Sequence, residues 1–369
     1  MAGRTYDPSL IEAIEEGART VDAGEANGPA GLELELRPCP DEPREHALDP
    51  RVWEMCKARM SGAVITPSFA DVSTFRAKPP KENYPLDSGA VAEEAVLMDF
   101  GNRRIPAHVF TPEGRADDRP CLIFYHGGGF TTGSIAQLRN VCRYIAELAD
   151  AVVIHPDYRL APEAPFPAAV DDCVETFDWT VSHASELGID ATRIAIGGDS
   201  AGGSLSNAVV QRVADSRHLR LVILIYALVD GGPVPDDWSY DLYPVIDEHA
   251  DGARMRVDRI KDANEDIAEM LCMGKAAQVL DPLISAAYAK NLELWPRTIS
   301  IDSEYDYLRH QDEQFAKALA DAGVSVRAIR YLGCDHGFLE QLGVMPQVED
   351  MCRIIADEMR AMPRRKKVF

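Results

Sequence analysis

The sequence predicts an α/β fold built on an eight-stranded, mostly parallel sheet that is flanked by helices. One observation is that short apolar runs, typical of buried strands, alternate with longer helix-like stretches from about residue 90 onward. A second is size: the chain has 369 residues, of which 46% are hydrophobic. That composition supports one large core with an elaboration, or two domains.

The expected strands are short segments rich in β-branched and aromatic residues. They lie at residues 95–100, 105–111, 121–125, 152–156, 193–197, 219–226, 297–301 and 324–331. The first two flank Asn102 and Arg103, which predicts an antiparallel hairpin. The later strands alternate with helix-like stretches, so we expect them to be parallel. These stretches lie at 135–148, 168–183, 205–213, 311–322 and 347–362.

Two segments interrupt this alternation, residues 1–90 and residues 231–280. The first is helical in places and rich in proline at 38–50 and 79–85. The second contains a helix candidate at 257–273 with apolar residues on one face. We therefore assign 91–230 and 281–369 to the core and the two interrupting segments to a separate helical region.

A Gly-x-Ser-x-Gly motif spans residues 198–202 and has Ser200 at its centre. Residues 193–196 before it are typical of a strand, and residues 201–213 after it of a helix. This is the context in which such a motif places a serine on a sharp turn. The flanking glycines suit a turn that leaves no room for a Cβ atom.

A glycine-rich stretch, His126-Gly127-Gly128-Gly129-Phe130, follows the apolar run at 122–125. Glycines at the end of a strand expose backbone N–H groups that no side chain shields. Such N–H groups can bind the oxygen of a tetrahedral intermediate as its negative charge develops.

Together these motifs resemble the hormone-sensitive-lipase family of α/β-hydrolases, which carries HGGG and GDSAG motifs. The segment 157–163 with Phe166-Pro167 is similar to a third motif of that family, YRLAPE…FP. The three motifs cover 120–203, weaker similarity extends to about Leu339, and the first ninety residues show none. The resemblance implies the α/β-hydrolase fold, with the two interrupting segments forming a helical cap over the serine.

The nine histidines leave one candidate for the base that a catalytic serine needs. In α/β-hydrolases the serine precedes the acid, which precedes the histidine. His336 satisfies this order and follows the strand at 324–331, where a site residue is expected in an open α/β sheet. The family also has a histidine followed by glycine and phenylalanine.

Three carboxylates follow the strand at 297–301 and could reach an imidazole: Asp302, Glu304 and Asp306. The family pattern of glutamate, aspartate, leucine and arginine at alternating positions matches Glu304 onward and selects Asp306, leaving Asp302 as the alternative. The sequence departs from this pattern at His310, where aspartate is common. We expect that difference to affect helix capping rather than chemistry.

The resemblance implies a serine carboxylesterase acting on short- to medium-chain acyl esters. Ser200 is the expected nucleophile, His336 the base and Asp306 its orienting acid. The backbone N–H groups of Gly128 and Gly129, by resemblance, and of Ala201, by the geometry of the turn, would form the oxyanion hole. We expect no metal and no cofactor. The alternatives are a deacetylase or amidase acting on a sugar or xenobiotic, and a ligand-binding member without catalysis.

The cap residues that select the substrate have no recognisable motif. Large apolar side chains in the cap segments are candidates for the pocket wall, each with ordinary packing as the competing interpretation. These candidates are Trp53, Met55, Met60, Trp238, Tyr240 and Tyr243.

The net charge of −22 argues against nucleic acid and anionic membranes as partners. No apolar run approaches the ~20 residues of a transmembrane helix, and the N-terminus lacks a secretory pattern. We therefore expect a cytoplasmic enzyme whose eight cysteines are free thiols, with Cys334 near the site. The strand at 324–331 is expected at a sheet edge, where it would pair with a second copy in a homodimer.

Overall fold

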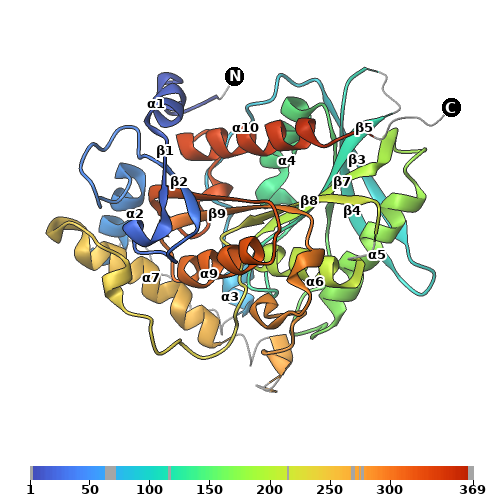
Figure 1. Cartoon of the computed structure of the whole chain (residues 1–369). Coiled ribbons are helices and arrows are strands. Elements are labelled where there is room, and N and C mark those ends of the chain that lie inside the picture. The colour runs from blue at the N-terminus through green and yellow to red at the C-terminus, as the bar shows by residue number, and fades with distance from the viewer. Residues whose placement is uncertain are drawn as a thin grey trace.

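A mixed sheet of ten strands forms the centre of the computed structural model, which describes residues 3–62, 72–114, 118–213, 216–266, 271–273, 275 and 278–364. The strand order is β1-β2-β10-β9-β8-β7-β5-β6-β4-β3 (Figure 1). The strands are β1 (Arg19–Asp22), β2 (Glu33–Arg37), β3 (Val91–Asp99), β4 (Arg104–Pro112), β5 (Arg119–Tyr125), β6 (Val152–Pro156), β7 (Ile189–Asp199), β8 (Leu219–Ile225), β9 (Arg297–Tyr305) and β10 (Val326–Asp335). The run from β2 to β6 is parallel, whereas β1, β3 and β4 are antiparallel to their neighbours.

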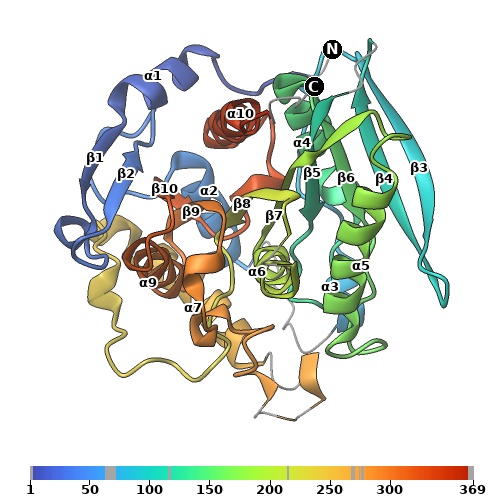
Figure 2. The same ribbon diagram turned by 45° about the vertical axis from the view of Figure 1, so that its right-hand side comes forward.

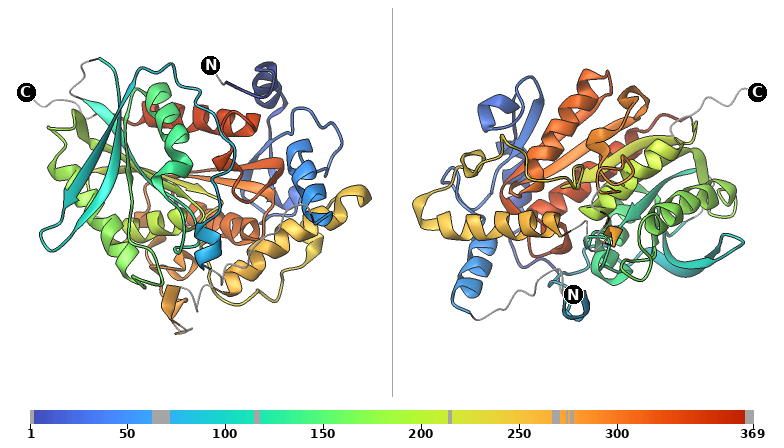
Figure 3. Two further views of the ribbon diagram at one scale, coloured as in Figure 1. Left: turned by 180° about the vertical axis from the view of Figure 1, so that it is seen from behind. Right: turned by 90° about the horizontal axis from the view of Figure 1, so that it is seen from below.

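Helices cover both faces of this sheet (Figure 2). One face carries α1 (Ser9–Gly17), α4 (Ile135–Ala149) and α10 (Pro346–Ala361). The other carries α5 (Ala168–Ser182), α6 (Ala201–Val213) and α9 (Leu308–Asp321). Outside these layers α2 (Pro50–Met60) lies beside α7 (Ala250–Glu265), and the short α3 (Val72–Arg76) follows α2 in the chain (Figure 3).

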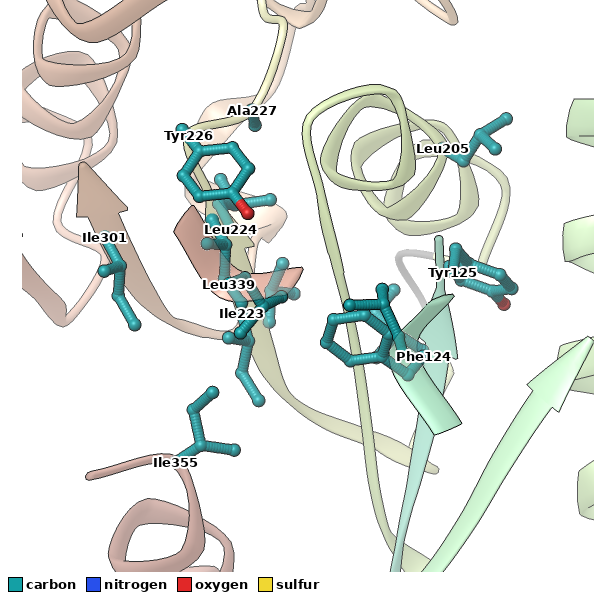
Figure 4. Close-up of a cluster of buried hydrophobic side chains, with 14 of the residues drawn as sticks. Phe124, Tyr125, Leu205, Ile223, Leu224, Tyr226, Ala227, Ile301, Leu339 and Ile355 are labelled. Carbon is teal, nitrogen blue, oxygen red and sulfur yellow. The ribbon is translucent and has the colours of Figure 1, made fainter. Parts of the chain in front are cut away.

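The central strands are buried on both sides, which explains why their sequences are continuous apolar runs. Every residue of β5 is buried, and β8 is buried except at its second position. Figure 4 shows Phe124 of β5 and Ile223 of β8 in this core, with Leu205 of α6 and Ile355 of α10 packed nearby. This core fixes the strand ends that carry the candidate site.

All eight strands expected from the sequence are present, and β3 with β4 forms the predicted hairpin. The expected number was nevertheless wrong, because β1 and β2 add two strands from the segment assigned to the cap. In β2 the residues Leu34 and Leu36 are buried with an outward-facing residue between them, the period-two pattern of a strand. The division into core and cap stays a prediction in other respects.

The expectation that the last strand lies at a sheet edge was also wrong. Strand β10 pairs with β9 on one side and with β2 on the other, in parallel both times. The outer strands of the sheet are β1 and β3. A second copy therefore has no free edge of β10 to pair with.

The helix predicted at 257–273 begins earlier, because α7 spans Ala250–Glu265. Residues 267–270 of the predicted helix lie outside the described residues. None of the described helices combines the length and the apolar character needed to cross a membrane. All eight cysteines are free thiols, and seven of them are buried.

Candidate active site

Ser200 lies on a sharp turn between the end of β7 and the first residue of α6. Its φ of 54° is in the left-handed region that non-glycine residues rarely adopt. A Cβ atom at Gly198 or Gly202 would overlap the carbonyl oxygen of Tyr125 in β5. The two glycines of the motif thus allow the turn to pack directly against the neighbouring strand and leave the serine hydroxyl at the sheet's carboxyl edge.

The structure brings the three predicted side chains together in one hydrogen-bonded chain. The Nε2 atom of His336 is 2.9 Å from the Oγ of Ser200, and its Nδ1 is 2.6 Å from Oδ2 of Asp306. Asp306 directly follows β9, and His336 directly follows β10. Since β7, β8, β9 and β10 are consecutive parallel strands, their carboxyl ends place these residues at one edge.

Asp306 is fully buried and held by its neighbours. The N–H of Leu308 donates to Oδ1 at 3.0 Å, and the hydroxyl of Ser303 donates to Oδ2 at 3.3 Å. These bonds hold the carboxylate in place, with Oδ2 2.6 Å from Nδ1 of His336. They match the role of an orienting acid.

The two other carboxylates considered for this position point elsewhere. Glu304 accepts the N–H of Gly333 at 2.8 Å and lies 3.3 Å from Nδ1 of His46. Burial, and then the negative charge of Asp312, raise the pKa of Asp302 well above its usual range. Neither is hydrogen-bonded to His336, so the geometry agrees with the choice of Asp306.

The glycine loop presents unused hydrogen-bond donors beside Ser200. Gly128 and Gly129 adopt φ values of 118° and 59°, and the carbonyl of Gly128 accepts the N–H groups of Thr131 and Thr132. The backbone N–H groups of Gly128, Gly129 and Ala201 donate to no other residue of the described chain. All three residues line the same cavity as Ser200.

That cavity has a volume of about 790 Å³ and opens over the serine. Its wall combines the glycine loop and the start of α4 with residues after α3 and residues of α7. Six side chains were candidates for the pocket wall, and none of them lines the cavity among the described residues: Trp53, Met55, Met60, Trp238, Tyr240 and Tyr243. Ordinary packing, the competing interpretation, holds for Trp53, whose ring centroid lies 4.4 Å from that of His249.

Residues 122–340 match the family model described as the alpha/beta hydrolase fold. The chain belongs to this family. The match covers the glycine loop, the serine turn, Asp306 and His336, so the residues of the candidate site lie inside the region that defines the family.

Similar proteins narrow the α/β-hydrolase assignment to the hormone-sensitive-lipase-like carboxylesterases, as the motifs predicted. The chain is 38% identical over 262 residues to the carboxylic ester hydrolase LipN of Mycobacterium tuberculosis, a match covering 65% of this chain and 62% of LipN. It is 32% identical over 254 residues to the carboxylesterase NlhH of that organism, covering 69% and 77%. This chain thus spans less than two thirds of the length of LipN.

A solved structure with the same α/β-hydrolase architecture is the hyperthermophilic esterase from the archaeon Pyrobaculum calidifontis. The two folds superpose with a TM-score of 0.67 at 26% sequence identity. The superposition covers 85% of this chain and 98% of that esterase. This agreement extends over nearly the whole of a smaller esterase.

One residue of the α/β-hydrolase site escaped the sequence analysis. Asp199, directly before the nucleophile, is buried and accepts the N–H of Gly127 at 2.8 Å. Burial, and then the negative charge of Glu340, raise its pKa to about 7, although the Gly127 N–H acts in the opposite direction. The Gly-x-Ser-x-Gly pattern leaves this position open, and the aspartate of the family's GDSAG motif was the signal that could have identified it.

The segment around His336 is held by residues far away in the sequence. Arg256 of α7 forms a buried ion pair with Asp335, and the ring of Tyr226 lies 4.7 Å from the imidazole. The ammonium group of Lys81 donates to the carbonyl of Gly337 at 2.6 Å. Cys334, by contrast, is buried away from the cavity, so the expectation that it lies at the site was wrong.

Proposed function

We propose that this protein is a serine carboxylesterase that hydrolyses short- to medium-chain acyl esters through an acyl-enzyme. The observation that carries the proposal is the continuous chain Ser200–His336–Asp306, with bonds of 2.9 Å and 2.6 Å, beside three unused backbone donors. The esterase names of LipN, NlhH and the Pyrobaculum protein support it.

In the first half of the reaction the Oγ of Ser200 attacks the ester carbonyl while His336 Nε2 takes its proton. Asp306 keeps the Nδ1 proton of the imidazole directed at itself, which leaves Nε2 free to accept, and it stabilises the imidazolium that forms. Collapse of the tetrahedral intermediate breaks the bond to the alcohol oxygen. His336 returns the proton to that oxygen, and the alcohol leaves.

The negative oxygen of the intermediate would be bound by the N–H groups of Gly128, Gly129 and Ala201. Their lack of other acceptors means that no existing hydrogen bond has to break when the charge develops. Loss of one such donor typically slows an enzyme by about a hundredfold to a thousandfold. In the second half, water activated by His336 attacks the acyl-enzyme and releases the acid through the same sequence of proton transfers.

The cavity volume suits a small to medium ester, since pockets for small molecules generally measure about 300–1,000 Å³. Because the cavity is lined by α7 and the segment after α3, these cap residues would enclose the acyl or alcohol group. The apolar members of the wall, such as Phe75, Leu228 and Ile260, favour ester groups with hydrocarbon chains.

The test is hydrolysis of p-nitrophenyl esters from acetate to decanoate by the wild type and by Ser200→Ala. We expect turnover greatest at short or medium chains and about a millionfold lower in the variant. A Ser200→Ala protein with wild-type activity would refute the proposed nucleophile. Turnover of a matched amide faster than its ester would favour the amidase alternative.

We also propose that the enzyme is a cytoplasmic homodimer. Free thiols at all eight cysteines are typical of a reducing compartment. Because β10 is covered, the dimer would use another surface, and the outer strand β3 with its exposed Leu97 is a candidate. Light scattering at micromolar concentration tests this: the dimer mass is expected, and a monomer mass would contradict it.

A further inference from the structure

The cavity over Ser200 is rich in positive charge, although the protein as a whole is strongly acidic. Against a net charge of −22, its described wall contains five cationic side chains and only two carboxyl groups. The cations are Arg59, Arg76, Lys78, Lys81 and Arg259, and the carboxyl groups are Asp199 and Glu340. A neutral ester has no need for such a lining.

Two of these cations have partners within the protein. Arg76 forms an ion pair with Glu163 at 2.8 Å, and Lys81 lies 3.6 Å from Glu340. Their charges are therefore largely compensated. They serve to hold the segment after α3 against the core.

Arg259 of α7 is different, because no carboxylate of the described residues lies within 4 Å of its guanidinium. Its Nη2 makes one long contact of 3.5 Å to the carbonyl of His336, and its Nε has no partner. Arg256, one turn earlier on the same helix, by contrast forms an ion pair with Asp335, although its Nη1 has no partner. The helix thus carries one arginine that is paired with a carboxylate and a second that has no carboxylate partner and an unbonded Nε.

Partial burial of an unpaired charge is unfavourable. The pKa of Arg259 shows this effect. Burial, and then the positive charge of Arg256, lower its pKa to about 10, so it remains protonated at neutral pH. The pKa of Lys78 is also lowered, by burial and then by Arg259, which indicates that the two cations lie near each other. An anion bound in the cavity would attract both cations and so raise the pKa values of Arg259 and Lys78.

We propose that this cavity selects esters that carry a second, free carboxylate group, and that Arg259, assisted by Lys78, binds that carboxylate. This inference rests on the proposed esterase function. A guanidinium with free donors suits the planar carboxylate, which can accept two parallel N–H bonds. A monoanion fits better than a phosphate dianion, because Asp199 and Glu340 in the same wall repel additional negative charge.

The carboxylate can belong to the acyl part or to the alcohol part of the ester, and matched substrate pairs separate the two. The acyl pair is p-nitrophenyl butyrate against the mono-p-nitrophenyl esters of succinate and glutarate. The alcohol pair is phenyl acetate against 4-acetoxybenzoate. The ratio of kcat/KM for the anionic over the neutral ester is measured in the wild type, in Arg259→Gln and in Arg254→Gln.

Arg254→Gln is the matched control, because Arg254 is an exposed arginine of the same helix that stacks on Tyr240 outside the cavity. We expect the wild type to prefer the anionic member of at least one pair. Arg259→Gln should lower that ratio about 10–100-fold, the worth of a charged hydrogen-bond pair, mainly through KM. Arg254→Gln should keep the wild-type ratio.

Two results would overturn the proposal: a wild type that prefers the neutral member of both pairs, or an Arg259→Gln protein that loses neutral and anionic turnover equally. The second result would assign Arg259 to the support of the His336 loop. Ser200-dependent hydrolysis of the neutral esters reports on the esterase function separately. If no ester is hydrolysed, binding of glutarate is measured instead. Glutarate should raise the Tm of Ser200→Ala but not the Tm of the double variant Ser200→Ala/Arg259→Gln. An unchanged Tm of Ser200→Ala would then refute the inference.

Discussion

At position 199 the chain buries a carboxyl group between the serine turn and the glycine loop. Asp199 accepts the Gly127 N–H and lines the cavity, yet its pKa of about 7 lies far above the ordinary 3.8. Between pH 4 and pH 7 the unfolded chain therefore releases a proton that the folded protein keeps. The folded state therefore loses stability relative to the unfolded state as the pH rises through this window. Above pH 7 this group causes no further loss of stability.

Asp199→Asn removes this titration while its amide oxygen still accepts the Gly127 N–H. The difference in unfolding free energy between variant and wild type should shift in favour of the variant by about 3 kcal/mol from pH 5 to pH 8, at about 1.4 kcal/mol per pKa unit. Urea unfolding at the two pH values measures it. A difference that does not change with pH would show that Asp199 titrates normally.

Among the elements, α7 is joined to the core through one buried ion pair. The guanidinium of Arg256 and the carboxylate of Asp335 are both almost completely inaccessible, and Asp335 directly precedes His336. The pair therefore links α7 to the segment that carries His336. Loss of either partner leaves a buried charge without compensation.

Arg256→Met should lower the free energy of unfolding by about 3–5 kcal/mol and reduce kcat, because the uncompensated Asp335 disturbs the His336 loop. The double variant Arg256→Met/Asp335→Leu removes both charges and should recover most of the stability. Urea unfolding of the wild type, both single variants and the double variant gives the coupling energy. Strictly additive effects would contradict a direct link between α7 and the histidine.

For the molecule as a whole, residues 19–37 contribute two strands to the main sheet. Strand β2 covers β10, and Leu34 packs with Leu36, Ala316 and Ala328 in a small second core. Leu34→Ala should lower the free energy of unfolding by about 2–5 kcal/mol while the protein still unfolds in a single transition. An additional early transition, with the rest unchanged, would show that this segment folds independently of the sheet.

Local patterns in the sequence were sufficient for the central strands and for the turn that carries Ser200. The choice of Asp306 among three carboxylates, and of His336 by its order in the chain, rested on the resemblance to the α/β-hydrolase family. Apolar runs mark the buried strands, and glycines mark the turns that only they can form. Strand β1 was not predicted, because its four residues are mostly exposed and form no apolar pattern. The pocket wall could not be predicted from the sequence, because it depends on how α7 and the segment after α3 meet. Arg259 could not be predicted either, because its neighbours in the sequence do not distinguish it from a surface arginine.

The most direct measurement of the central claim is intact-protein mass spectrometry after brief exposure to diethyl p-nitrophenyl phosphate. The Oγ of Ser200 should displace p-nitrophenolate from phosphorus while His336 takes the proton, giving one diethylphosphoryl group per chain. Peptide mapping should place it on Ser200, and His336→Ala should react far more slowly. No adduct, or an adduct on another residue at the same rate in both proteins, would contradict the account.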